Sequence, residues 1–267
     1  MVESRGIRIA LRVATALILG FMYLPIVVLG IYAFNESRLQ AWPPVGFTVR
    51  WFIEAVQNEA ILRALANSLI AGASATVMAL ILGTLAALVV QRYSFFGKQT
   101  ISFFLVLPIA LPGVVTGIAL RTTFVTFGID FGLMTIIVGH ATFCVVIVYN
   151  NVIARLRRLP RTPEEASADL GADSFATFRR ITLPGMGTAL LSGALLAFAL
   201  SFDEIIVTNF TAGAGTQTIP MWIYTAIQRP NELPVVNVVA LVLILVSVIP
   251  VYIAQRITSG EVAGVAR

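Results

Sequence analysis

The sequence predicts an all-α, polytopic integral membrane protein that crosses the bilayer six times. Hydrophobic residues fill 58% of its 267 positions and charged residues only 12%, an apolar share that a single water-soluble core could not enclose. Apolar runs of about 20 residues, the length that a helix needs to cross the hydrocarbon layer, recur along the chain. Six spans are therefore expected, at about 13–34, 67–90, 101–120, 133–153, 187–210 and 234–254.

The positive charges predict the orientation of these spans. Of the 18 Lys and Arg residues, most precede the first span or fall in the loops on the same side, which the positive-inside rule assigns to the cytoplasm. Both termini are then expected to be cytoplasmic. This bias alone accounts for the formal net charge of +5, so the basic composition predicts no nucleic-acid partner.

The first span is expected to remain as an anchor. It follows Arg5, Arg8 and Arg12, as a secretory signal would. It is longer than the apolar part of such a signal, and it leads into Asn35-Glu36-Ser37 rather than into a small-residue cleavage site.

The outer segment of about 35–66 is expected to combine a turn with a helix. Trp42-Pro43-Pro44 indicates a turn or an extended stretch. Trp51 and Ala55 then begin an apolar face at helical spacing, with polar residues such as Glu54 on the other face. This pattern predicts an amphipathic helix that lies along the membrane interface.

The third span is interrupted by Pro108, Pro112, Gly113 and Gly117. These residues predict either a kinked helix with close backbone packing or a bend that lets a passage open, and the two interpretations are compatible.

The fourth span contains the single histidine and the single cysteine of the sequence. For His140 we expect a structural hydrogen bond between helices rather than a binding site. Cys144 has no second cysteine to pair with, so we expect it to be a small buried apolar residue.

The fifth span contains two acids, Asp203 and Glu204. About 16 residues of helix, or roughly 24 Å, separate them from Gly187, which places them in the outer leaflet. Ionisable groups at this depth usually face a cavity or a partner charge. We therefore weigh a role in a cation pathway against a structural ion pair, for example with Arg121 or with another subunit.

Hydroxyl groups extend this acidic pair into a stripe along one side of the helix. The members at helical spacing are Ser201, Glu204, Thr208 and Thr211. Because Asp203 and Glu204 point about 100° apart on a helix, the stripe favours Glu204 as the acid that faces the pathway. Which of the two contacts a solute stays open.

A polar insert, EEASADLGADSFATFRRITLP at 164–184, separates the fourth and fifth spans. Thr162, Pro163 and Glu165 predict a capping box with proline at the first helical position. The helix should end near Leu170, because Gly171 supplies a left-handed conformation at little steric cost.

A second short helix should follow this glycine turn. Asp173 is a suitable N-cap for SFATFRRI, and Pro184 should mark its end. Arg179 and Arg180 lie near the negative C-terminal end of this helix. By charge alone a solvated helical hairpin explains the insert as well as a contact surface does.

The insert resembles a known motif. Glu165-Ala166-Ser167, Gly171 and Ile181-Thr182-Leu183-Pro184 are similar to the EAA loop of bacterial ATP-binding cassette (ABC) importer permeases, except that the family usually has alanine in place of Ser167. The resemblance covers nearly the whole chain and is greatest to the spermidine/putrescine class, as in LVLPIALPGVVTGIAL, GHATFCVVIVYNNVIARLRR and LLAFALSFDEIIVTNFTAG.

This resemblance implies a single type I ABC permease domain over 1–267 in a bacterial inner membrane, with membrane lipid around it. It implies a second permease subunit, an ABC ATPase dimer and an extracytoplasmic solute-binding protein as partners. The cytoplasmic loop of about 155–184 would couple the spans to the ATPase. Glu165, Ala166 and Gly171 match the motif and are carried over for this contact, and Asp169 and Leu170 lie on the short helix between them and are expected to share it.

The sequence predicts no catalytic residues, metal site or cofactor of its own. Gly97-Lys98-Gln99 lacks the Ser or Thr and the upstream glycine of a phosphate-binding loop. Metalloprotease and serine-hydrolase motifs are absent from the sequence. ATP is therefore expected to bind to partner subunits.

We expect a permease subunit of an ATP-driven, binding-protein-dependent importer, with a polyamine as its solute. The expected solute-pathway residues are Asp203, Glu204, Ser201 and Thr208. Two alternatives remain: ABC import of another small solute, and an ATP-independent channel or secondary carrier.

Overall fold

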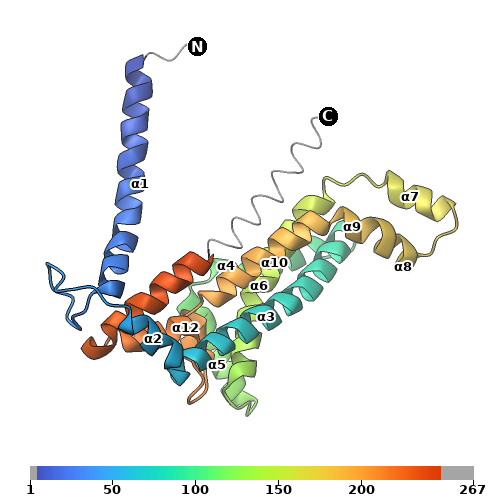
Figure 1. Ribbon diagram of the computed structural model, residues 1–267. Helices are drawn as coiled ribbons and strands as arrows, with labels where there is room; N and C mark the ends of the chain where they lie inside the picture. The colour runs from blue at the N-terminus through green and yellow to red at the C-terminus, as the bar shows by residue number, and fades with distance from the viewer. Residues whose placement is uncertain (1–4, 248–267) are drawn as a thin grey trace. The chain divides into compact units, whose positions relative to one another are not determined.

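The computed structural model describes residues 5–247, and its regular structure over this range is helical, without a strand (Figure 1). The elements are α1 (Arg5–Phe34), α2 (Arg50–Gln57), α3 (Glu59–Arg92), α4 (Lys98–Ala110), α5 (Gly113–Thr126), α6 (Leu133–Leu156), α7 (Thr162–Asp169), α8 (Ser174–Thr177), the π turn η1 (Phe178–Thr182), α9 (Leu183–Gly185), α10 (Gly187–Phe202), α11 (Ile206–Thr211), α12 (Ile219–Ala226) and the 3-10 turn η2 (Pro230–Glu232).

The prediction of an all-α polytopic membrane protein is confirmed. Within the described range, four helical segments are long and apolar enough to cross a membrane: α1, α3, α6 and Pro230–Ser247. Two bent helix pairs raise the number to six if each pair is one span. The predicted sixth span, 234–254, begins inside the last segment, and its final residues lie outside the described range.

The third span is broken rather than smoothly kinked. Helices α4 and α5 meet at an angle of 106°. Leu111 has extended backbone angles, φ −81° and ψ 142°, because the ring of Pro112 disfavours a helical conformation in the residue before it. Close packing is also present, since a Cβ atom at Gly117 would overlap the ring of Phe210.

The fifth span is also two helices, which corrects the prediction of one continuous helix over 187–210. Helix α10 ends at Phe202, with Asp203 as its C-cap, and α11 begins at Ile206. The Glu204 Oε1 atom accepts a hydrogen bond of 2.8 Å from the N–H of Val207. This carboxylate satisfies a free donor at the start of α11 and so stabilises a second helix.

The described residues divide into two compact units. In the unit that contains α1 and α2, the carbonyl of Asn35 accepts a hydrogen bond of 2.8 Å from the Trp51 indole. The predicted interfacial helix is shorter than expected, because Asn58 ends α2 with extended angles and its side chain accepts from the N–H of Ala60 in α3. The prediction of a single domain over 1–267 stays a prediction.

Helix α6 forms the core of the other unit, residues 63–222. Its buried residues pack with small residues of α3, including Ala75, Ala79 and Ala87. A Cβ atom at Gly83 would come within 2.8 Å of the Val145 carbonyl, so α3 and α6 approach closely there. Small residues permit such close backbone contact between membrane helices. Helix α10 also packs against α6, and α7 and α8 lie beyond its N-terminal end (Figure 1).

Candidate functional site

The insert between α6 and α10 folds as a chain of short helices, although its first cap differs from the prediction. Arg161, not Thr162, is the N-cap of α7, and it makes no side-chain capping bond. Its carbonyl accepts from the N–H groups of Glu164 and Glu165. The capping-box prediction is therefore wrong, because Thr162 already lies inside the helix and its hydroxyl is one position too late to cap it.

The predicted turn and the second cap are both confirmed. Helix α7 ends at Asp169, and Gly171 has a left-handed φ of 82°. The Asp173 side chain accepts a hydrogen bond of 2.6 Å from the N–H of Ala176. Glycine and aspartate thus perform the two local roles that their residue types favour.

Pro184 does not end the second helix as predicted. A π turn, in which the N–H of Leu183 bonds to Phe178 O, leads into α9 with Pro184 near its start. The chain bends by 66° between this segment and α10. Proline lacks an N–H, and π turns and prolines are common causes of such bends.

One side of the insert between α6 and α10, the predicted coupling loop, is exposed. Glu165, Ala166, Asp169, Leu170 and Gly171, the residues predicted to meet an ATPase, are all exposed. Leu170 is 89% exposed. Phe175 on α8 is 71% exposed and was not among the predicted site residues, although it lies on the second short helix that the sequence predicts.

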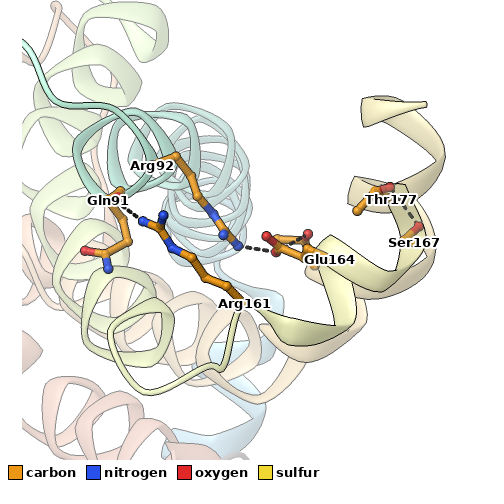
Figure 2. A network of polar contacts seen from close by, with 7 residues as sticks. Gln91, Arg92, Arg161, Glu164, Ser167 and Thr177 are labelled. Carbon is orange, nitrogen blue, oxygen red and sulfur yellow. Dashed lines mark hydrogen bonds and ion pairs between the residues drawn. The ribbon is translucent and has the colours of Figure 1, made fainter. Parts of the chain in front are cut away.

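The other side of the loop is held to the end of α3 (Figure 2). Glu164 Oε1 accepts hydrogen bonds from the Arg92 guanidinium and, at 2.6 Å, from the Thr182 hydroxyl. Arg161 donates to the Gln91 carbonyl at 3.5 Å. The hydroxyls of Ser167 and Thr177 lie 2.9 Å apart and join α7 to α8. The loop therefore has an anchored face and a free face.

A second polar site lies inside the helical core and centres on His140. Its side chain is fully buried. Nδ1 lies 2.7 Å from the Ser201 hydroxyl and Nε2 lies 2.8 Å from the Thr208 hydroxyl. The Thr208 hydroxyl also donates to the carbonyl of Glu204 at 2.8 Å, so its oxygen is free to accept from Nε2–H. The predicted interhelical hydrogen bond of His140 is confirmed.

The four predicted pathway residues separate into two pairs. Ser201 and Thr208 are buried, with their hydroxyls on His140. Asp203 is exposed at the C-terminus of α10, and Glu204 is half-buried between α10 and α11. The predicted polar stripe is therefore divided between a closed cluster and an accessible acid.

Arg121 does not pair with either acid within the described residues. Its Nη1 donates to the Phe210 carbonyl at 3.5 Å, and its guanidinium lies 5.1 Å from the centroid of the Phe131 ring. Ion pairs within the described residues include that of Arg92 with Glu164 and that of Arg229 with Glu232. Cys144 is buried, as expected, and its thiol donates to Ala197 O at 3.3 Å.

Comparison with known proteins assigns this arrangement to a family. Residues 79–261 match the family described as binding-protein-dependent transport system inner membrane component. The putrescine transport system permease protein PotI of Escherichia coli (strain K12) is 38% identical over 234 residues, which cover 84% of this chain and 82% of PotI. The spermidine/putrescine transport system permease protein PotC of the same strain is 32% identical over 248 residues, 92% of this chain and 93% of PotC.

Solved structures share the fold. A chain of a bacterial alginate ABC transporter, determined in complex with an alginate pentasaccharide-bound periplasmic protein, superimposes with a TM-score of 0.71 at 16% sequence identity. The match covers 94% of this chain and 93% of that one.

Replacement of His140 by alanine should destabilise the core. The change leaves the buried Ser201 and Thr208 hydroxyls without their shared partner and opens a cavity, at a cost of about 2–4 kcal/mol. The melting temperature of the subunit in detergent should fall by roughly 4–12 °C. The matched control is Asn209→Ala, because Asn209 is exposed on neighbouring α11. Equal melting temperatures for the two variants would contradict a central role for the cluster.

Proposed function

Because this chain belongs to the family of binding-protein-dependent transport system inner membrane components, we propose that it is the permease subunit of an ATP-driven importer of polyamines. The observation that carries the solute class is the identity with PotI and PotC over most of all three chains. Putrescine and spermidine are flexible cations with two or more amines, so their passage through a membrane requires compensating carboxylates or carbonyls.

Three kinds of partner complete the proposed importer. A second permease subunit forms the pathway with this chain, an ABC ATPase dimer binds and hydrolyses ATP, and a solute-binding protein delivers the polyamine. The family description names a binding protein, and the alginate transporter was determined with a periplasmic protein. The permease itself performs no chemistry, and its role is to change shape when its partners do.

Helix α7 is the proposed contact with the ATPase. Ala166 and Leu170 lie one turn apart and can enter an apolar groove, while Glu165 and Asp169 form a neighbouring acidic stripe for basic groups of the partner. The full exposure of this face supports the proposal, since a leucine that is 89% exposed gains most from a covering partner. Gly171 sets the direction in which the chain leaves α7.

Asp203 is the proposed cation contact in the outer half of the pathway. Its carboxylate is exposed, whereas one carboxylate oxygen of Glu204 is used by the N–H of Val207. The observed break between α10 and α11 thus favours Asp203 over Glu204 as the acid that contacts the cation. The sequence pattern favoured Glu204, because on a continuous helix this acid would lie in one polar stripe. Ser201 and Thr208 support this break through His140, and their own contact with solute stays a prediction.

The proposed location is the inner membrane of a bacterium, with several spans and cytoplasmic termini. The basic residues near α1, the α7–α9 loop and the end of α3 support this orientation. Arg256 and Arg267, which belong to the same count, lie outside the described residues.

Cysteine labelling tests the orientation. In a Cys144→Ala background, Ser174→Cys should react with a membrane-impermeant thiol reagent only from the cytoplasmic side, and Gln57→Cys only from the opposite side. Both positions are exposed, so access to the reagent depends on the side of the membrane. Labelling from the reverse sides would show that the assignment is inverted.

Replacement of Gly171 by valine tests the coupling face. The φ of 82° costs a β-branched residue about 1–2 kcal/mol or more, and no atom lies within 4 Å of a Cβ placed there. Backbone strain is therefore the main effect. We expect weaker co-purification of the ATPase and slower uptake, with normal behaviour for Ala172→Val at the adjacent exposed position. Normal association and uptake in Gly171→Val would exclude the proposed role.

Uptake into vesicles tests the function and the solute together. Vesicles that hold the complete importer, supplied with solute-loaded binding protein and ATP, should take up labelled putrescine or spermidine but not neutral or anionic solutes. Asp203→Asn should reduce the initial rate by roughly tenfold, the factor that corresponds to about 1.4 kcal/mol, and Glu204→Gln should reduce it less. Asp130→Asn is the control, because Asp130 is also an exposed acid.

Two results would overturn parts of this proposal. Polyamine uptake without ATP or an ATPase would indicate a channel or secondary carrier. If both Asp203→Asn and Glu204→Gln took up polyamine at the wild-type rate, neither acid would select cations. Cation selection would then have to be assigned to the binding protein or to the second permease.

A further inference from the structure

Glu164 lies next to the motif residue Glu165 but has a different environment. Glu165 is exposed, whereas the Glu164 side chain is only 20% exposed and points to Arg92, which is 23% exposed. The same Glu164 oxygen, Oε1, also accepts from the Thr182 hydroxyl at 2.6 Å. One carboxylate oxygen therefore joins three segments of the chain (Figure 2).

One partner of Glu164 stands at the end of a long helix, and the other stands in the segment that leads to α10. Arg92 is the last residue of α3, a helix of 34 residues. Thr182 is the last residue of the π turn and leads through α9 into α10. A displacement of α7 would thus act through Glu164 on two segments at once: the end of α3 and the segment that leads into α10.

The Glu164 contacts form the strongest link between α7 and the spans. Hydrogen bonds to ionised groups are roughly twice as strong as neutral ones, and partial burial reduces their screening by water. The bond from Arg161 to Gln91 is exposed and 3.5 Å long. The bond between Ser167 and Thr177 is neutral and stays within the loop.

The π turn is a second feature that suits the contacts of Glu164 with Arg92 and Thr182 to transmitting movement. Single π turns occur frequently at functional sites, and this one ends at Thr182, whose side chain is buried. The 66° bend follows directly after α9. Beyond it, the 16 residues of α10 extend roughly 24 Å to Asp203.

We infer that Glu164 is a positioning residue that transmits the movement of α7 to α3 and α10 together. This inference rests on the proposed docking of α7 on an ATPase. Helices α3 and α10 both pack on α6, so a joint displacement of their cytoplasmic ends changes the packing around this core helix. The exposed face of α7 binds the partner, and the Glu164 face conveys the motion.

The test separates transmission from docking. The complete transporter, with ATPase and binding protein, is prepared with Glu164→Ala, Glu164→Gln, Thr182→Val or the charge exchange Arg92→Glu with Glu164→Arg. The matched control is Glu165→Gln, one residue away on the exposed face. Three quantities are measured: co-purification of the ATPase, stimulation of ATP hydrolysis by loaded binding protein, and initial uptake rate per assembled complex.

Glu164→Ala should keep ATPase co-purification within about twofold of wild type, while uptake falls roughly tenfold, as expected for the loss of a charged hydrogen bond. Stimulation of ATP hydrolysis by binding protein should fall with it. The charge exchange should restore most of the uptake. Glu164→Gln and Thr182→Val should give smaller losses, and Glu165→Gln should affect co-purification more than the uptake of the complexes that do assemble.

Wild-type uptake in Glu164→Ala would overturn the inference. It would also be overturned if uptake per assembled complex were unchanged and only the amount of complex fell, since Glu164 would then serve folding alone. Failure of the charge exchange to restore uptake, with the complex intact, would likewise show that the pairing of Arg92 with Glu164 is not the link. Failure of the proposed function looks different: the wild-type permease itself would not bind an ATPase or would transport without ATP.

Discussion

Hydrocarbon offers no hydrogen-bonding partner, so each polar backbone group within a span must find its partner inside the chain. The break between α10 and α11 can exist only because local side chains satisfy the groups that it frees. Glu204 accepts from Val207 N–H, Thr208 donates to the Glu204 carbonyl, and His140 holds Thr208. The polar residues of the fifth span thus have a structural task before any contact with solute.

The same constraint explains the contrast between the two ends of α10. At the end next to Asp203, a closed polar cluster supports a break in the helix within the predicted fifth span. At the end next to Met186, a π turn and a proline redirect the chain where water can satisfy spare backbone groups. The helix between these ends is apolar and packs along α6.

Local features were predictable from sequence to the extent that short-range chemistry determines them. The apolar runs, the left-handed Gly171, the Asp173 cap and the interhelical role of His140 all follow from residue type and near neighbours. The break at Asp203 was not predicted, because no proline or glycine marks it and its stability comes from a side chain that folds back to Val207. The prediction of Thr162 as the N-cap was wrong because the helix begins one residue earlier than expected, with Arg161 as the cap. The separation of α2 from α3 was not predicted either, because it depends on a local hydrogen bond of the Asn58 side chain. The pairing of Glu164 with Arg92 joins residues 72 positions apart, a distance over which a single sequence carries no signal.

The two faces of α7 have different consequences for how the protein can be altered. Glu164 and Arg92 belong to one chain, so a change in either can be compensated within this gene product. Leu170 and its exposed neighbours form the proposed docking face and would instead have to match another chain. If α7 docks on an ATPase as proposed, a permease engineered to accept a foreign ATPase would need new residues on the exposed side of this short helix, and the contacts of Glu164 behind it could be kept.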